Sequence, residues 1–376
     1  MKIALVCDDL IQFGGAEKIV MELCSIFPDS PLYTSVISKK WREICRSKNI
    51  KVITSFIQQL PFSVILNRYY SPFFFHLCAF HSFDLSSYDL VLSISARFAH
   101  TVITKPDTKH ICYMHSPGRM FWEPFSYFEK EYTGILGMFK KLFKPILSIS
   151  LFFHRIIDYI SAQKVDNFIA NSKNTKMKIL KYYGRESNIV YPFMDIDNLK
   201  DEVGESVNNG SRERYFLIIS RLSSWKKIDY AINACEELGV YLKIVGEGSD
   251  RNRLNRLCKK YVKLMGYVSN QDRNNLIKGC QALIITQEED FGIVPLEAMY
   301  LGKPVIAYGK GGSTETIEEG VTGVFYYSQN SDALKEVLNN FNPANFDSNK
   351  CKQRAMQFSK SKFKQKILEI INNVYY

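Results

Sequence analysis

The feature that most constrains the fold is a repeated alternation of short apolar strands and amphipathic helices, interrupted once by a polar stretch. The first series opens with a strand predicted at Ile3–Cys7 and a helix at 16–27 whose apolar residues share one face. A second series opens at 215–220, includes a helix predicted at 249–260, and runs to a strand at 304–307. Residues 195–214 between them are rich in Gly, Asn and Ser, which is linker composition. Such alternation predicts an α/β fold with one helix-covered parallel sheet in each half of the chain.

The length of 376 residues suits two domains of ordinary size. We place the first at 1–195 and the second at 196–357, with a helical segment predicted at 358–376. Open parallel sheets bind ligands beyond the carboxyl ends of their strands. We therefore expect the active site in a cleft between the two domains.

Nine cysteines are scattered without a C-x-x-C pair, which argues against zinc and disulfide frameworks and favours a reducing cytosol. The first residues resemble a core strand followed by two aspartates rather than a signal peptide. The longest apolar run near the basic segment, 145–153, is too short to span a membrane, and we expect an interfacial or core-packed helix there.

The net charge is +11, and residues 138–185 contribute ten Lys/Arg against two Asp/Glu. A basic segment of this kind suits an anionic partner such as phospholipid headgroups or a diphosphate-linked acceptor. Nucleic acid is disfavoured because no recognised binding module accompanies the charge. A solvated helix face is the alternative reading of the same charges.

Two carboxylates, Glu289 and Glu297, bracket a loop-to-helix transition after a predicted strand that ends at Thr286. Gly292 between them permits close approach of the backbone to a ligand, and the first helical turn offers unpaired N–H groups and positive potential to a phosphate. Helix capping explains Glu289 but not Glu297, which lies within an apolar run. We therefore interpret the pair as binding residues for sugar and ribose hydroxyls.

Arg221 and Lys226 lie five residues apart, where the first strand of the second series ends and the next helix begins. Two fixed cations at this place can clamp a diphosphate and neutralise the charge that grows on a leaving group. A solvated turn is the alternative.

Gly14 and Gly15 open the first helix, where paired glycines permit tight approach to a phosphate; the signal is weak by itself. His115 follows a predicted strand, and a lone histidine is more often structural. Asp195 and Asp197 resemble a metal-binding D-x-D but lie in the linker, where they indicate turn chemistry.

Two glycine-rich turns leave their role open. Residues 245–251 imitate the start of a dinucleotide fingerprint, but Arg251 replaces the third glycine, so nicotinamide binding is disfavoured. Residues 309–315 suit either a second diphosphate contact or a plain turn.

These motifs together resemble glycosyltransferase family 4, the retaining enzymes of the GT-B fold, and in particular bacterial mannosyltransferases that build O-antigen and other surface polysaccharides. The resemblance covers nearly the whole chain and is carried by segments including GGAEKIV, CYMHSPGRMFWEP, SRLSSWKKIDYAI and EEDFGIVPLEAMYLGKPVIAYGKGGSTETI. It implies two Rossmann-like domains that face a central cleft. It also implies that the helix at 358–376 packs back on the first domain.

The resemblance implies roles for residues of the second domain. Arg221 and Lys226 would hold the donor diphosphate, Glu297 the ribose, and Val268 would lie by the base. Glu289 would bind the transferred sugar. The backbone that binds this sugar with it would be that of Phe291, Gly292, Ile293 and Val294.

In the first domain, the resemblance implies that Gly14 and Gly15 approach the diphosphate and that His115 lies by the sugar. The transition state of such a transfer joins a positively charged sugar to a negative diphosphate, so electrostatic stabilisation is the main task. Arginine, lysine and helix dipoles can supply it, and we predict no metal and no cofactor.

We therefore expect a retaining hexosyltransferase, with mannose as the favoured sugar and GDP-mannose as the favoured donor. The acceptor would be lipid-linked or a polysaccharide in bacterial surface-glycan synthesis. We expect a cytoplasmic enzyme held loosely at the anionic inner membrane face by the basic segment. Two alternatives are a catalytically silent sugar-binding or scaffold protein of the same fold and a nucleotide-sugar epimerase.

Overall fold

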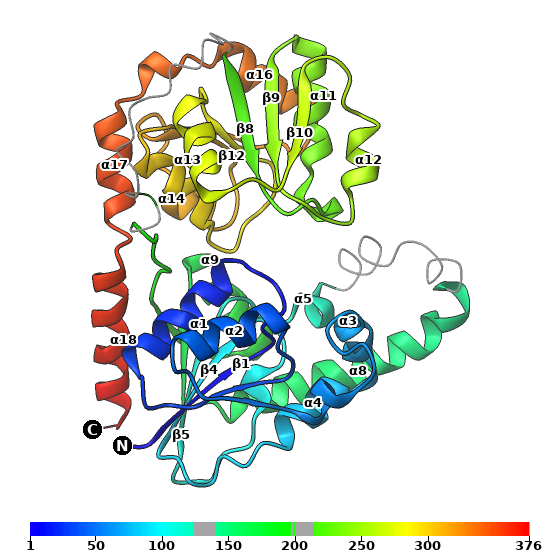
Figure 1. Ribbon diagram of the computed structural model, residues 1–376, viewed down its shortest axis with the longest axis vertical. Coiled ribbons are helices and arrows are strands. Elements are labelled where there is room, and N and C mark those ends of the chain that lie inside the picture. The colour runs from blue at the N-terminus through cyan, green and yellow to red at the C-terminus, as the bar shows by residue number, and fades with distance from the viewer. Residues whose placement is uncertain (124–139, 197–198, 200–213, 376) are drawn as a thin grey trace. The chain divides into compact units, whose positions relative to one another are not determined.

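The computed structural model describes residues 1–123, 140–196, 199 and 214–375. They form two compact units, one of Met1–Tyr191 with Lys364–Tyr376 and the other of Pro192–Phe363. Each unit is built on one parallel β-sheet with helices (Figure 1), so the predicted α/β fold class is confirmed. Most of the predicted linker lies outside the described residues, as do residues 138 and 139 of the basic segment.

The first unit contains a seven-stranded parallel sheet with the order β3-β2-β1-β4-β5-β6-β7. Its strands are β1 (Ile3–Cys7), β2 (Leu32–Thr34), β3 (Val52–Thr54), β4 (Leu90–Ser95), β5 (Lys109–Met114), β6 (Asn167–Ala170) and β7 (Ser187–Ile189). The central strands β1 and β4 are buried along their whole length, as expected for a parallel sheet covered on both faces.

The helices of this unit are α1 (Gly15–Ile26), α2 (Lys39–Ser47), α3 (Asn67–Tyr70), α4 (Phe75–His81), α5 (Arg119–Trp122), α8 (Lys140–Gln163) and α9 (Lys173–Tyr183). Three 3-10 turns accompany them in the described part of this unit: η1 (Phe56–Gln59), η2 (Ser71–Phe73) and η3 (Ala99–Thr101). Helix α1 packs against β1 (Figure 1). Helix α8 packs against α5, α9, η2 and η3. No helix in the described ranges is long and apolar enough to cross a membrane.

The second unit contains a six-stranded parallel sheet with the order β10-β9-β8-β11-β12-β13. Its strands are β8 (Tyr215–Ile219), β9 (Tyr241–Val245), β10 (Val262–Gly266), β11 (Leu283–Ile285), β12 (Val305–Tyr308) and β13 (Gly323–Tyr326). The order reverses between β8 and β11, so the connections after these two strands leave the sheet in opposite directions. That point is where sheets of this kind bind their ligands.

The helices of the second unit are α11 (Ile228–Leu238), α12 (Arg251–Asn255), α13 (Asn270–Gly279), α14 (Ile293–Tyr300), α15 (Ser313–Thr316), α16 (Ser331–Asn340) and α17 (Ser348–Met356), with 3-10 turns η4 (Ser224–Lys226) and η5 (Pro343–Asn345). Helix α11 packs on α16 and β9, whereas α14 packs on α17, β11 and β12. The last helix, α18 (Lys360–Tyr375), begins in the second unit and belongs to the first from Lys364 onward.

The structure corrects one predicted helix. Residues 249–260 were expected to be helical, but α12 ends at Asn255. The carboxylate of Glu236 on α11 accepts hydrogen bonds from the backbone N–H groups of Lys259 (2.7 Å) and Val262 (3.1 Å). These amides are therefore held by a side chain of the neighbouring helix instead of continuing the helical ladder.

Candidate functional site

The predicted donor-binding residues of the second unit lie on the loops that follow adjacent strands. Arg221 and Lys226 follow β8, and Glu289 follows β11. Because β8 and β11 are neighbours in a parallel sheet, their carboxyl ends meet at one edge. The two motifs, distant in sequence, thus share the switch point of the sheet.

The structure brings Lys226 and Glu289 into direct contact. The Nζ atom of Lys226 lies 2.7 Å from Oε1 of Glu289, and the Lys226 residue is 8% exposed. Gln287 donates a hydrogen bond from Nε2 to the same carboxylate oxygen. Nζ of Lys226 also lies 4.1 Å from the ring centroid of Trp225, within cation–π range. The lysine is thereby fixed by a carboxylate and an aromatic face.

The backbone ties these two loops together as well. The hydroxyl of Thr286 donates to the carbonyl of Lys226 at 2.5 Å. Gln329 donates from Nε2 to the carbonyl of Thr286 at 3.1 Å. The side chain of Thr286 thus holds the backbone of Lys226, while its own carbonyl is held by Gln329. These two bonds set the position of the lysine relative to the end of β11.

Helix α14 begins at the same edge. Its N-cap residue is Gly292, with φ +89°, a left-handed region that side chains other than glycine rarely adopt. The cap has no side-chain hydrogen bond, so the first amides of Ile293 and Val294 are not satisfied by a capping side chain. The helix start at Ile293 thus presents N–H groups and the positive end of its dipole three residues beyond Asp290.

The glycine turn at 309–312 serves packing. The N–H of Gly312 donates to the carbonyl of Glu289 at 2.7 Å. A Cβ atom on Gly312 would come within 2.3 Å of the Cα of Phe291, and one on Gly311 within 2.3 Å of the Glu289 carbonyl oxygen. These glycines let the turn lie directly against the backbone of the 289–291 loop and so support its shape.

Glu297 forms a second ion pair that sequence reasoning missed. Glu297 is 3% exposed, and its Oε2 atom accepts a hydrogen bond from Nη2 of Arg273 on α13. The only signal for Arg273 is a base within the polar run that follows Ser269, which does not distinguish it from a solvated helix face. Val268, the predicted neighbour of the base, is half-buried on the loop that leads into α13.

Arg221 is exposed and lies two residues beyond the end of β8. The loop that carries it is held by the second glycine-rich turn. Gly246 has φ +136°, and a Cβ atom there would lie 1.9 Å from the Ser220 carbonyl oxygen; on Gly248 it would lie 2.1 Å from that of Leu222. The turn that imitates a dinucleotide fingerprint therefore supports the arginine loop by close packing.

Three predicted site residues belong to the first unit. Gly14 is the N-cap of α1 with extended backbone (φ −162°), and Gly15 begins the helix. His115 follows β5 and is half-buried. Its N–H donates to the Ser95 carbonyl at 2.8 Å, and its carbonyl accepts from the Thr175 hydroxyl at 3.1 Å. The backbone of His115 is thus fixed at the carboxyl edge of the sheet.

The same edge of the first unit contains an anchor that sequence reasoning missed. The carboxylate of Asp8, just beyond β1, accepts four backbone hydrogen bonds of 2.6–2.9 Å. The donors are the N–H groups of Ala96, Arg97, Phe98 and Ala99. Asp8 therefore holds the loop after β4 in place.

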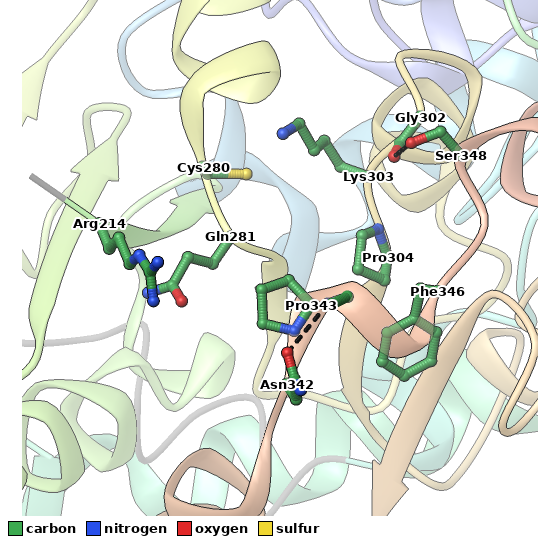
Figure 2. Close-up of a pocket in the computed structure, with 11 residues that line it drawn as sticks. Arg214, Cys280, Gln281, Gly302, Lys303, Pro304, Asn342, Pro343, Phe346 and Ser348 are labelled. Carbon is green, nitrogen blue, oxygen red and sulfur yellow. Dashed lines mark hydrogen bonds between the residues drawn. The ribbon is translucent and has the colours of Figure 1, made fainter. Parts of the chain in front are cut away.

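A cavity of about 330 Å³ in the second unit lies at the opposite edge of its sheet (Figure 2). Its lining includes Arg214, Gln281 and Pro304, which lie one or two residues before β8, β11 and β12. These are the amino ends of the strands, whereas Lys226 and Glu289 follow carboxyl ends. The cavity is therefore separate from the candidate donor site.

Comparison with known proteins finds similarity to glycosyltransferases. Residues 200–358 match the model of the family described as glycosyl transferases group 1. The chain is 28% identical over 199 residues to an uncharacterized glycosyltransferase of Methanocaldococcus jannaschii, covering 47% of this chain and 51% of that protein. It is 28% identical over 266 residues to the alpha-1,3/1,6-mannosyltransferase ALG2 of Candida glabrata, covering 53% and 57%. The matches span about half the length of these curated relatives.

Solved structures share the whole fold. The Anabaena protein HepE, in complex with UDP, superimposes with a TM-score of 0.71 at 19% identity and covers 99% of this chain and 100% of its own. Sucrose-phosphate synthase from Thermosynechococcus elongatus superimposes with a TM-score of 0.72 at 15% identity, covering 100% and 99%. The chain therefore has the GT-B fold, and the match of residues 200–358 supports a glycosyltransferase enzyme.

Proposed function

We propose that the protein is a retaining glycosyltransferase of family 4 that moves a hexose from a nucleoside-diphosphate sugar to a lipid-linked or polysaccharide acceptor in bacterial surface-glycan synthesis. The observation that carries the proposal is the Lys226–Glu289 pair beside the start of α14, at the switch point of the second sheet. This region lies within the segment that matches the group 1 glycosyltransferase model.

The chemistry follows from the charges at this edge. Cleavage of the anomeric C–O bond leaves negative charge on the departing diphosphate, which Arg221, Lys226 and the α14 amides would stabilise. Glu289 would then bind hydroxyls of the sugar, and its contact with Lys226 keeps its carboxylate in place. For retention, the departing phosphate takes the proton of the acceptor hydroxyl on the face where the new bond forms. The transfer thus needs no metal ion and no carboxylate that attacks the sugar.

The buried carboxylate of Glu297 suits the ribose of the donor. A carboxylate accepts hydrogen bonds from paired hydroxyls, and Arg273 holds it in one orientation. Val268 would lie by the base. The roles of Gly14, Gly15 and His115 stay predictions.

Mannose is the favoured sugar because several curated relatives are alpha-1,3/1,6-mannosyltransferases. GDP-mannose is accordingly the favoured donor, and UDP-sugars are the first alternative because HepE was solved with UDP and with UDP-glucose. The basic segment 138–185 supports a cytoplasmic enzyme that makes peripheral contact with the anionic inner membrane face.

The test is transfer by the purified full chain from a panel of GDP-, UDP- and ADP-sugars, with lipid-linked acceptors and EDTA. We expect one donor to be consumed, the product to retain the anomeric configuration, and EDTA to have no effect. Glu289→Ala and Arg221→Ala should each lower kcat/KM by at least about 10³-fold, because each removes charge at the reacting centre. Lys263→Ala, an exposed base on β10, is the matched control and should retain full activity.

Turnover of no donor, with or without acceptor, would contradict the proposal. Tight donor binding without turnover would identify a sugar-binding protein instead. Epimerised donor formed without an acceptor would identify an epimerase, and strict EDTA sensitivity would refute the metal-free mechanism.

A further inference from the structure

The long helix α8 exposes apolar side chains where a helix of a water-soluble protein exposes polar ones. From residue 148 onward, where its side chains are described, six large hydrophobic residues are 40–60% exposed: Ile149, Phe152, Phe153, Ile156, Tyr159 and Ile160. At 100° per residue these positions fall on one side of the helix. They form a continuous apolar face, which we call the α8 face.

The polar residues of α8 point the other way. Ser150, His154 and Asp158 are at most 9% exposed. Nδ1 of His154 donates to the Ser150 carbonyl at 2.8 Å. The carboxylate of Asp158 accepts hydrogen bonds from Trp122 Nε1 (2.7 Å) and the Tyr183 hydroxyl (2.9 Å).

These inward hydrogen bonds fix the rotation of the helix. Turning the α8 face toward the core would move Asp158 away from its hydrogen-bond donors. Its carboxylate would then be a buried charge without a partner, which costs free energy. The apolar exposure is therefore a stable property of this fold. Large exposed apolar patches in soluble proteins mark surfaces that bind something.

Basic residues of this segment, including exposed lysines on the neighbouring helix α9, indicate the kind of partner. Residues 138–185 contain ten bases and two acids, and one of these acids is the buried Asp158. Helix α9, which packs on α8, exposes Lys173 and Lys181 together with Met177 (61%) and Leu180 (41%). Apolar side chains bordered by lysines are the pattern of helices that lie in the headgroup region of anionic membranes.

A second copy of the chain fits this surface less well. Pairing two α8 faces would bring two sets of lysines together, and like charges across an interface oppose association. A bilayer with anionic headgroups satisfies both features, because the apolar face enters the acyl boundary while the bases remain at the phosphates.

We propose that the α8 face is a membrane-docking surface, on which α8 lies parallel to an anionic bilayer with its apolar residues inserted. This inference deepens the proposed peripheral location by assigning the contact to one helix face. According to this proposal, membrane binding depends on the apolar residues of the α8 face and not on the basic charge alone.

The experiment is co-sedimentation of the full chain with vesicles of phosphatidylcholine alone and of phosphatidylcholine with one-quarter phosphatidylglycerol. The test variant is Ile149→Ser/Phe152→Ser, and the matched control is Ile103→Ser/Met356→Ser, which removes two hydrophobic residues of similar exposure (51% and 50%) elsewhere. We expect the wild type and the control to bind the anionic vesicles and the test variant to bind at least tenfold more weakly. Circular dichroism and donor turnover in solution should be the same for all three.

Each other outcome has a defined meaning. Equal vesicle binding by the test variant would overturn the α8 assignment while leaving the peripheral location standing. No binding by the wild type would overturn both, without bearing on transfer from the donor. A concentration-dependent dimer in light scattering that the test variant loses would show that a second copy, not a bilayer, covers the face.

Discussion

The two units contain the same kind of sheet but use the polar groups at its carboxyl edge differently. In the first unit, Asp8 is committed to four backbone amides, and Asp9 pairs with Arg97 and accepts from Asn67. In the second unit, Lys226 and Glu289 pair with each other beside an uncapped helix start. The first arrangement holds loops of the protein, whereas the second offers charges and amides that a ligand can engage.

The distribution of histidines also differs between the two units. All six histidines belong to the first unit and the second has none. Burial lowers the pKa of His76 to about 4 and that of His110 to about 3. Both are hydrogen-bonded inside the unit, His76 Nε2 to Asn67 (2.8 Å) and His110 Nε2 to Ser93 (2.8 Å). The first unit thus uses these polar side chains inside its own packing.

The largest expected effect concerns the loop anchor of the first unit. Asp8→Ala leaves four amides without their acceptor and should lower the free energy of unfolding of this unit by about 5 kcal/mol. Hydrogen exchange of the β4 amides measures this change. Asp107 is exposed, so Asp107→Ala is the control and should lower the free energy of unfolding by less than about 0.5 kcal/mol. A loss below about 1 kcal/mol for Asp8→Ala would break the comparison, because the carboxylate would then not hold the loop.

Acid should destabilise the first unit before the second. His76 and His110 have folded pKa values well below the ordinary 6.5, so below pH 6.5 the unfolded chain binds protons that the folded unit does not. The contribution of these two histidines to the free energy of unfolding is complete above pH 6.5. It decreases as the pH falls, by about 2 kcal/mol for each histidine between pH 7 and 5. Hydrogen exchange at the two pH values should show this loss in β4 and β5. An equal loss in β8 and β11 would contradict it.

The smallest expected effect tests the role of the Arg273–Glu297 ion pair. Arg273→Ala removes the partner of Glu297 and should raise the KM for the donor about tenfold with a smaller change in kcat, because ribose binding is affected more than bond cleavage. Arg273→Lys should restore part of the loss. Lys335→Ala is the control, since it removes a base that pairs with Asp332 at 2.8 Å on α16, a helix that contributes no residue to the candidate donor site. An unchanged KM would show that Glu297 needs no positioning.

Local patterns predicted more of the structure than distant contacts did. The strand Ile3–Cys7 follows from spacing within a short segment, and the structure agrees. The same holds for the placement of Lys226 and Glu289 on the segments that follow β8 and β11. Strands β2 and β3 have three residues each, too few for a periodic signal. Arg273 with Glu297 and Asp8 with the 96–99 loop join residues far apart in sequence, which no local pattern reveals.

Helix α8 shows the limit of periodicity in another way. An apolar stripe at helical spacing ordinarily predicts the face that packs on the core. Here the buried side contains His154 and Asp158, whose partners come from distant residues such as Trp122 and Tyr183. The sequence predicts that one face is apolar, but those distant contacts decide that this face points outward.

The central claim is that the donor binds at the carboxyl edge of the second sheet. Hydrogen exchange with and without saturating donor tests it most directly. We predict slower exchange of amides at 291–294 and in the 221–226 loop, with no change at 280–281 and 303, which line the cavity at the amino edge (Figure 2). Protection at the amino edge, with unchanged exchange at the start of α14, would contradict the account.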